Sequence, residues 1–218
     1  MALSTHGRTI DVTGFGWLQE QLPPFEAGVL DLPAWFGFDR PDLPLELEIG
    51  SGKGTFLVQQ ATQTPEVNYL GIEWAKAFWR HAADRARRHG LGNVRLLRAE
   101  ASFFVRHYIP PASLAQVHLY FPDPWPKARH NKRRLFQEPF LRLLHPALMP
   151  GGQIRIATDH SDYFAWMEDH AQRVSDLYQR LDFESPVSAG EGEWVGTNFE
   201  RKYRREGRPF HGMILRRH

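Results

Sequence analysis

The 218-residue sequence contains no cysteine, which excludes disulfide bonds, thiolate metal sites and cysteine nucleophiles. It also lacks any stretch that approaches the roughly 20 apolar residues of a membrane-spanning helix. The opening residues, MALSTHGRTIDVTG, contain no apolar run of the secretory-signal type. We therefore expect a cytoplasmic protein that inserts into no membrane and holds no metal.

The sequence also has little net charge, formally +2 at pH 7, so the molecule as a whole is not a strongly basic binder. Its cations nevertheless cluster at 127–134 and again at 201–208. A local basic patch is the electrostatic footprint expected where phosphate groups bind. A run of charges is just as often a solvated face, so the two clusters leave both interpretations open.

Hydrophobic residues make up 42% of the chain, enough for one substantial core, and the length favours a single domain. Residues 1–44 contain many helix and strand breakers and little periodicity, so we expect an irregular N-terminal extension before a domain at 45–218. From residue 45 onward, apolar runs alternate with segments of helical period. Such alternation predicts an α/β fold with a mostly parallel sheet covered on both faces.

The expected elements can be placed along the chain. Strands are expected at 45–49, 68–74, 93–99, 114–121, 152–158 and near 210–217. Helices are expected from residue 55 and at 75–89, 102–109, about 135–148 and 161–180. In the helix 75–89, the period of 3.6 predicts one apolar face, formed by Ala75, Phe78, Trp79, Ala82, Ala83 and Ala86.

The first expected strand ends in a glycine turn, Glu48-Ile-Gly-Ser-Gly-Lys-Gly54. Ligands of parallel sheets bind at the carboxyl ends of the strands, and Gly50 and Gly52 would let the backbone approach a ligand closely. The spacing matches neither a P-loop nor the G-x-G-x-x-G dinucleotide turn. An ordinary strand-to-helix turn is the alternative interpretation.

Acidic residues follow the next two expected strands. Glu73 stands where a carboxylate can accept hydrogen bonds from both ribose hydroxyls of a nucleoside, and Trp74 beside it can pack on a base. Glu100 stands where a carboxylate can accept from an adenine amino group. For Glu73 and Glu100 the alternative is an acid at a helix N-terminus, which the helix dipole favours.

The fourth expected strand runs into YFPDPWPKARHNKRR, where Asp123 lies between Pro122 and Pro124. The two prolines fix φ and remove two amide donors, which suits a carboxylate that must hold one position. Trp125 adds an aromatic face, and Asp159 adds an acid after the fifth strand. A ligand site at this edge of the sheet is the simplest interpretation.

Taken in order, these motifs resemble the tRNA (guanine-N7)-methyltransferase family, a family of class I S-adenosylmethionine-dependent enzymes. The glycine turn with Glu73 is similar to a class I cofactor pocket, and the block Phe121-Pro-Asp-Pro-Trp-Pro-Lys127 is the most specific motif. The run 129–134, Ala157-Thr-Asp159 and Thr197-Asn-Phe-Glu200 follow in the family's order. The resemblance implies a Rossmann-like, mostly parallel seven-stranded sheet with helices on both faces and an antiparallel C-terminal strand.

The resemblance also implies roles for single residues, with Asp123 expected to be catalytic. The expected contacts to S-adenosylmethionine are Glu48, Gly50, Gly52, Glu73, Trp74, Glu100 and Asp123. The substrate nucleoside is expected to contact Lys127, Asp159, Thr197, Asn198, Phe199 and Glu200. The RNA is expected to contact Arg129, His130, Asn131, Lys132, Arg133 and Arg134. Glu100 replaces the Asp or Asn that is more usual in the family.

The implied reaction is methylation of guanosine N7 in tRNA, at position 46 of the variable loop. It needs no general base, because N7 of neutral guanine is an acceptor without a proton. The protein mainly aligns N7, methyl carbon and sulfur and excludes water, while Asp159 and Glu200 would accept from the guanine N1–H and amino group. Three other functions stay open: a nicotinamide oxidoreductase, an RNA-binding protein without catalysis, and a methyltransferase for a protein or small molecule.

Overall fold

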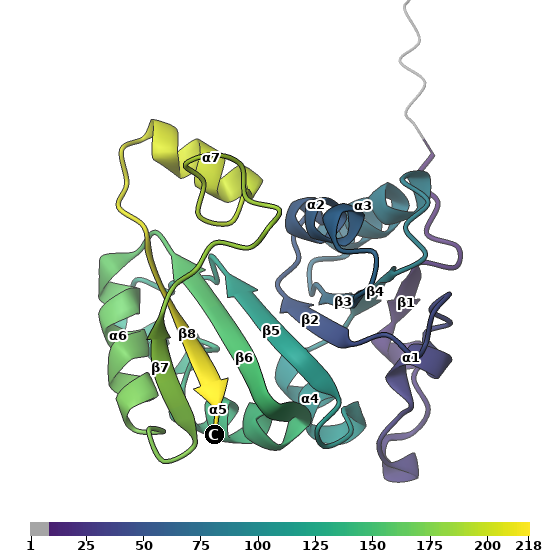
Figure 1. The fold of residues 1–218 in the computed structure, drawn as a ribbon, viewed down its shortest axis with the longest axis horizontal. Helices are drawn as coiled ribbons and strands as arrows, with labels where there is room; N and C mark the ends of the chain where they lie inside the picture. Colours follow the sequence, from purple (N-terminus) through teal and green to yellow (C-terminus); the bar gives the residue numbers. More distant parts are fainter. Residues whose placement is uncertain (1–8) are drawn as a thin grey trace, which may run out of the picture.

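The computed structural model describes residues 9–218, which form one eight-stranded sheet flanked by helices (Figure 1). Its strands are β1 (Gly16–Leu18), β2 (Leu45–Ile49), β3 (Asn68–Ile72), β4 (Val94–Arg98), β5 (Leu114–Tyr120), β6 (Leu148–Thr158), β7 (Tyr178–Asp182) and β8 (His211–Arg217). The α-helices are α1 (Leu32–Trp35), α2 (Thr55–Gln63), α3 (Lys76–Arg88), α4 (Ala101–Tyr108), α5 (Glu138–Leu144), α6 (Ser161–Gln172) and α7 (Asn198–Arg205). Short 3-10 segments are η1 (Gln19–Gln21), η2 (Phe25–Ala27), η3 (Ala128–Arg133) and η4 (His145–Ala147).

The strand order is β1-β4-β3-β2-β5-β6-β8-β7. Neighbouring strands from β1 to β6 are parallel, and β8 is antiparallel to both β6 and β7. The chain extends the sheet from β2 through β3 and β4 on one side and through β5 and β6 on the other. The order therefore reverses between β2 and β5, which is where ligands bind in sheets of this kind.

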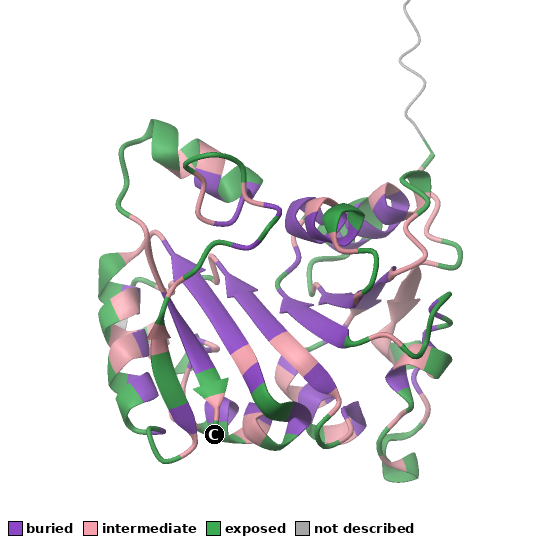
Figure 2. Cartoon of the chain, in the orientation of Figure 1, coloured by how far each residue is buried: buried purple, intermediate pink, exposed green. Residues whose placement is uncertain are grey.

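Helices cover both faces of the sheet, and for this reason every residue of β2 and β3 is buried (Figure 2). Phe56 of α2 and Trp79 of α3 belong to one core cluster. Phe104 of α4, Leu141 of α5 and Met167 of α6 belong to the second, larger cluster. No helix among the described residues is both long and apolar enough to span a membrane.

The predicted strand 45–49 is confirmed residue for residue, and the next three strands end within two residues of expectation. The N-terminal region is more ordered than expected, because β1 pairs in parallel with β4 and makes the sheet eight-stranded rather than seven-stranded. Leu32 and Phe36 of the same region are buried in the main core. Residues 1–8 of the expected extension lie outside the described part of the chain.

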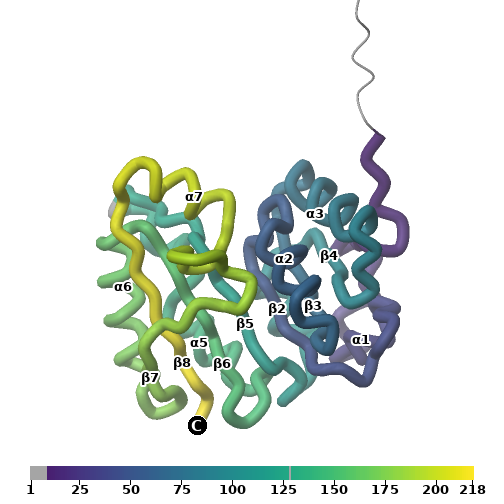
Figure 3. Tube along the Cα trace, turned by 45° about the horizontal axis from the view of Figure 1, so that its top comes forward, coloured from purple at the N-terminus to yellow at the C-terminus, as the bar shows by residue number. Residues whose placement is uncertain are grey.

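The C-terminal part of the chain differs from expectation in several elements. The helix expected at about 135–148 is shorter, Glu138–Leu144, and β6 begins at Leu148 rather than at 152 because its first residue already pairs with Leu114 of β5. The helix expected at 161–180 ends at Gln172, and β7 begins at Tyr178 because it pairs with the distant β8. The charged stretch after Thr197 forms α7, whose first amide groups receive a cap from the Thr197 hydroxyl. Helix α7 lies beyond the carboxyl ends of β5 and β6, on the opposite side of the site from α2 and α3 (Figure 3).

Candidate active site

Two adjoining cavities lie at the carboxyl edge of the sheet where the strand order reverses. We call the first the Glu48 lobe, with a volume of about 290 Å³, and the second the Asp123 lobe, with about 540 Å³. They share a wall formed by Gly50, Gly52, Phe78, Tyr120, Phe121 and Phe199. The two lobes therefore adjoin, and the residues of the shared wall lie between the glycine turn and the proline-rich turn.

The glycine turn has the backbone conformation that its residue types permit. Gly50, Gly52 and Gly54 all have positive φ angles, 81°, 53° and 69°, in the region that glycine adopts without strain. A Cβ on Gly54 would lie 2.9 Å from Cβ of Ala82, so glycine also lets α2 approach α3. The amides of Gly50 and Ser51 donate to the carbonyl of Ile72, which fixes the turn against the end of β3.

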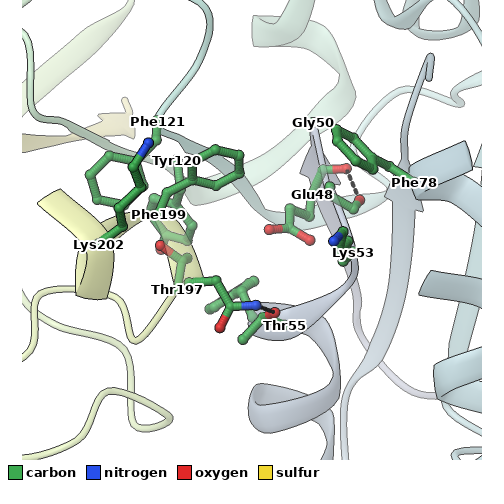
Figure 4. A pocket seen from close by; sticks show the side chains of 14 residues that line it. Glu48, Gly50, Lys53, Thr55, Phe78, Tyr120, Phe121, Thr197, Phe199 and Lys202 are labelled. Atoms are coloured by element: carbon green, nitrogen blue, oxygen red, sulfur yellow. Dashed lines mark hydrogen bonds between the residues drawn. The ribbon is translucent and has the colours of Figure 1, made fainter. Parts of the chain in front are cut away.

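Glu48 is the deepest acid of the site. Only 4% of the residue is exposed, it lines the Glu48 lobe, and its Oε2 has no hydrogen-bond partner among the described residues. Burial raises the pKa of its carboxyl to about 8; the Ser51 hydroxyl opposes the shift, and the nearby Glu73 charge adds to it. Figure 4 shows Glu48 opposite Thr197, Phe199 and Lys202. A buried acceptor without a donor calls for a ligand that carries one.

Glu73 joins the glycine turn to the start of α3. Its Oε2 accepts from the amide of Gly52 at 2.8 Å, and its Oε1 accepts from the amide of Ala75 at 2.7 Å. Each carboxylate oxygen can accept a second hydrogen bond, and Glu73 lines the Asp123 lobe. The Glu73 carboxylate therefore connects the glycine turn to the start of α3 and can still accept hydrogen bonds from a ligand.

The structure separates Trp74 and Glu100 from the lobes. Trp74 is 62% exposed, and the Arg98 guanidinium stacks 5.2 Å from the centre of its ring. Glu100 caps α4, accepting from the amides of Ser102 and Phe103 at 2.9 and 2.6 Å. Neither residue lines the two lobes, so for Glu100 the structure favours the alternative of an acid at a helix N-terminus.

The proline-rich turn holds Asp123 in a strained loop. Phe121 and Trp125, on either side of it, have positive φ angles of 51° and 43°, which bulky side chains rarely adopt. Asp123 Oδ1 accepts from the amide of Trp125 at 3.1 Å, and the side chain is exposed in the Asp123 lobe. The turn thus presents a carboxylate to the cavity from a conformation that needs outside support.

Two expected substrate-binding acids already have partners. Asp159 Oδ2 accepts from Arg208 Nη1 at 2.8 Å, although Asp159 lines the Asp123 lobe. Glu200 is fully buried and accepts from the amides of 194–196 and from Arg204. Glu200 does not line either lobe. Its neighbours Thr197, Asn198 and Phe199 do line the Glu48 lobe, and Asn198 donates to Thr55 of α2 at 3.0 Å.

The basic run 127–134 divides into exposed cations and one buried arginine. Lys127, Arg129, Lys132 and Arg133 are exposed and form no ion pair with any carboxylate of residues 9–218. Arg133 stacks on Trp125, with 5.0 Å between the guanidinium carbon and the ring centre, and lines the Asp123 lobe. Arg134, expected to contact RNA, is instead 2% exposed and paired with Asp162. Its interior position follows from this pairing and from the aromatic rings of α6 that lie against it.

Sequence reasoning missed several residues of the site. Phe78 was assigned to the core face of α3, but it is 39% exposed and forms part of the wall of both lobes. Arg106 of α4 lines a third cavity beside Lys132 and Arg133. Arg133 lines both this cavity and the Asp123 lobe, so the cationic surface extends onto α4. Nothing in the sequence around Arg106 distinguishes it from any other exposed helical arginine.

No group of three or more His, Asp or Glu side chains within residues 9–218 is arranged to hold a metal ion. The catalytic candidates are thus single carboxylates in a cavity lined by glycine backbone and aromatic rings. Such a site can hold a cationic cofactor beside a flat ring and align the two for group transfer. The arrangement favours group transfer from a bound donor.

Comparison with known proteins agrees with this geometry. Residues 42–213 match the family described as "Putative methyltransferase". The chain is 39% identical to the "tRNA (guanine-N(7)-)-methyltransferase" of Halorhodospira halophila (strain DSM 244 / SL1), in an alignment that covers 92% of this chain and 85% of that protein. It is 35% identical to the protein of the same name from Myxococcus xanthus (strain DK1622), in an alignment that covers 93% of each.

Two solved structures share the fold. The aminoglycoside resistance methyltransferase NpmB1 has a TM-score of 0.59 at 13% identity, over 87% of this chain and 94% of that chain. The 16S rRNA methyltransferase KamB has a TM-score of 0.57 at 18% identity, over 84% of this chain and 92% of that chain. With the motifs, the cavity and the two relatives considered together, the chain belongs to the tRNA (guanine-N(7)-)-methyltransferase family.

Proposed function

We propose that this methyltransferase transfers a methyl group from S-adenosylmethionine to N7 of guanosine in tRNA, and that guanosine 46 of the variable loop is the target. The observation that carries the proposal is a pair of adjoining cavities with a shared wall, one lined by Glu48 with its unpartnered oxygen and the other by Asp123. The names of the relatives support tRNA and guanine N7. The choice of position 46 rests on the motif resemblance.

The residues of the Glu48 lobe fit the proposed donor. Glu48 Oε2 is a buried acceptor without a donor among the described residues, and an α-ammonium group supplies such donors. A Cβ on Gly50 would meet nothing within 4 Å, so the turn leaves open space beside the lobe. Glu73 lines the adjoining Asp123 lobe, where it binds the amide of Gly52 in the shared wall and keeps acceptor capacity for ribose hydroxyls. When bound, S-adenosylmethionine supplies an electrophilic methyl group on a positively charged sulfur.

The side chains of the shared wall would orient the two reactants. Phe121 and Phe199 line both lobes, and aromatic rings exclude water and stack on a purine. Guanine N7 needs no deprotonation, so no residue has to act as a general base. Asp123 would favour the positive charge that develops on the purine as the methyl group moves. The catalytic role is therefore electrostatic and depends on how firmly the turn holds the carboxylate.

Asp159 is the better candidate for reading guanine, because it lines the Asp123 lobe and Glu200 does not. Within residues 9–218, the partner of Asp159 is Arg208, which binds Oδ2, and Oδ1 can accept from the guanine amino group or N1–H. The ion pair with Arg208 would keep the carboxylate oriented. We assign Glu200 a different role: it accepts from the amides of 194–196 and so holds the segment that carries Thr197 and Phe199 over the cavity.

The unpaired cations would bind the RNA backbone. Arg129, Lys132 and Arg133 are exposed, and Arg133 lines the Asp123 lobe. Arg106 extends this surface, because it lines the third cavity together with Lys132 and Arg133. Cations that are free of carboxylates gain most from phosphate, since no existing ion pair has to break. Lys127 follows the proline-rich turn and is exposed as well, which suits a contact to the substrate nucleoside or its phosphate.

The decisive test incubates the purified protein with unmodified tRNA and labelled S-adenosylmethionine, followed by nucleoside analysis. The expected product is 7-methylguanosine from tRNA that carries guanosine 46, and none from the same tRNA with adenosine at that position. Label in another nucleoside, or equal transfer to both tRNAs, would overturn the proposal. Thermal stabilisation by S-adenosylhomocysteine but not by NAD would separate it from nicotinamide chemistry.

A further inference from the structure

Arg134 lies in the interior although it ends a run of exposed cations. It is 2% exposed, even though it lines the third cavity, and it is the largest of the fully buried side chains. Its Nε donates to the carbonyl of Pro124 at 2.8 Å, and its Nη2 donates to Asp162 Oδ2 at 2.9 Å. Its guanidinium carbon lies 4.8 Å from the ring centre of Tyr163 and 5.2 Å from that of Trp166.

These contacts connect the two turns that carry the acids of the site. Pro124 follows Asp123 directly, and Asp162 lies in the first turn of α6, three residues after Asp159. The rings that enclose the guanidinium are themselves fixed: the Tyr163 hydroxyl accepts from the amide of Phe136. Trp166 donates to the carbonyl of the same residue. Arg134 therefore joins the proline-rich turn to a rigid helix.

The proline-rich turn has few hydrogen bonds of its own. Pro122 and Pro124 carry no amide donor, and the hydrogen bond that Asp123 makes to its own turn is the one from the amide of Trp125. Phe121 and Trp125 hold backbone conformations that cost free energy. Such a loop keeps its shape only when surrounding groups determine it, and the bond from Arg134 to Pro124 is adjacent to the carboxylate.

From this geometry we propose that Arg134 is a positioning residue for methyl transfer: it holds the Asp123 turn in place and does not bind phosphate. The inference rests on the proposed function, because it assigns Asp123 to that reaction. A planar guanidinium can donate in two directions in its own plane while two rings lie against its faces. A lysine ammonium keeps the charge but cannot reproduce this set of contacts. Arg134→Lys therefore separates geometry from charge.

Arg95 provides a matched control at the opposite end of the sheet. It is also buried, its Nε donates to the carbonyl of Phe36 at 3.1 Å, and its Nη2 pairs with Asp39 at 3.3 Å. Its guanidinium likewise lies near two rings, those of Phe15 and Phe38. Arg95→Lys removes the same kinds of contact near the start of β4, away from the carboxyl edge, so it reports the general cost of the exchange.

The experiment compares Arg134→Lys, Asp162→Asn, Arg95→Lys and wild type in single-turnover methylation at saturating tRNA and donor. We expect Arg134→Lys to slow transfer by roughly 10- to 100-fold, Asp162→Asn to slow it less, and Arg95→Lys to leave it unchanged. The affinity for tRNA and its salt dependence should match wild type in all three variants. If Arg134→Lys does not fold, Asp162→Asn tests the inference by itself. Asp162 is exposed, and its substitution leaves the Arg134 guanidinium in place.

Two results would overturn the inference. One is a wild-type transfer rate in both Arg134→Lys and Asp162→Asn. The other is a weaker tRNA affinity with a flatter salt dependence in Arg134→Lys, which would make Arg134 a phosphate contact. Failure of the proposed function would look different, because wild type itself would then transfer no methyl group to tRNA.

Discussion

The two basic segments, 127–134 and 201–208, look alike in the sequence and differ in their partners. In the first, every exposed cation lacks a carboxylate partner among residues 9–218, and only the buried Arg134 is paired. In the second, Arg201 pairs with Glu193 at 2.7 Å, Arg204 with Glu200 at 2.7 Å and Arg208 with Asp159 at 2.8 Å. The first segment presents free charge to solvent, whereas three of the five cations of the second hold carboxylates; the other two, Lys202 and Arg205, are exposed and form no ion pair within residues 9–218.

The difference leads us to expect phosphate binding from cations that are unpaired. An arginine that is already held by a carboxylate gains less from RNA, because the new contact replaces an old one. The carboxylates that pair with Arg201, Arg204 and Arg208 tie the second segment to the loop before α7 and to the rim of the site. We therefore expect RNA binding mainly from the first segment and, in the second, only from Lys202 and Arg205.

The largest expected effect contrasts the two acids next to these segments. Asp123→Asn should slow single-turnover transfer by roughly 100-fold or more, because an amide does not gain attraction for the purine as positive charge develops. Asp159→Asn should mainly weaken tRNA binding or guanine selectivity, since its carboxylate is already neutralised by Arg208. Single-turnover rates with saturating substrates measure both variants.

An equal loss of transfer rate in the two variants would contradict the assignment of catalysis to Asp123 and of guanine recognition to Asp159. Wild-type turnover in Asp123→Asn would make Asp123 only a cap of its own turn. Since no base is required, the pH–rate profile of the wild type should show no essential base that disappears in Asp123→Asn.

The second prediction compares the segments directly. Replacing Arg129, Lys132 and Arg133 by Ala should weaken tRNA binding and reduce its salt slope by about 0.7–0.9 for each phosphate that the protein no longer binds. Replacing Arg201 and Arg204 by Ala should lower the melting temperature and leave the salt slope nearly unchanged, because these side chains hold Glu193 and Glu200. Titrations of tRNA at several salt concentrations measure the slopes. A wild-type slope in the triple variant would make the first run a solvated face.

The third prediction concerns Glu48, an acid that neither basic segment pairs with. Its pKa is raised from 4.5 to about 8 by burial, so the folded protein binds this proton more tightly than the unfolded chain does. The free energy of unfolding should therefore fall as the pH rises from about 4.5 to 8. Glu48→Gln should be more stable than wild type at pH 9, on the order of 5 kcal/mol, and nearly equal to it near pH 4.5.

Denaturant unfolding of the free protein at both pH values tests this sign. Glu168→Gln serves as the control, because it exchanges a half-buried acid of α6 that lines neither lobe. A stability difference that does not depend on pH would assign Glu48 a packing role.

Donor binding should release a proton in wild type and not in Glu48→Gln, which calorimetry in buffers of different ionisation enthalpy detects.

The smallest expected effect defines the edge of the RNA surface. Arg106→Ala should weaken tRNA binding modestly and reduce the salt slope by about 0.7–0.9, the amount of a single phosphate contact. Arg173→Ala serves as the control, because Arg173 is exposed but already paired with Asp169 at 2.6 Å. The slope of Arg106→Ala should differ from that of Arg173→Ala. Identical slopes would limit the RNA surface to η3.

The sequence alone was sufficient for features that depend on neighbouring residues. Alternating strands and helices predicted the parallel sheet, the strand 45–49 was placed residue for residue, and the glycines of the first turn were placed where positive φ is needed. The turn with the prolines around Asp123 was likewise placed correctly at the carboxyl edge, after β5. Local conformational preference and hydrophobic period decide such features, and both are written in a short stretch of chain.

Only the tertiary structure decided which partners the same residue types have. The strands β1 and β7 form because distant strands offer hydrogen-bonding edges, at β4 and β8. Arg133 and Arg134 are adjacent and chemically identical, yet one is exposed and the other is buried between two rings of α6. Burial, charge pairing and orphaned acceptors such as Glu48 Oε2 depend on groups far away in the chain, and for this reason no local pattern reveals them.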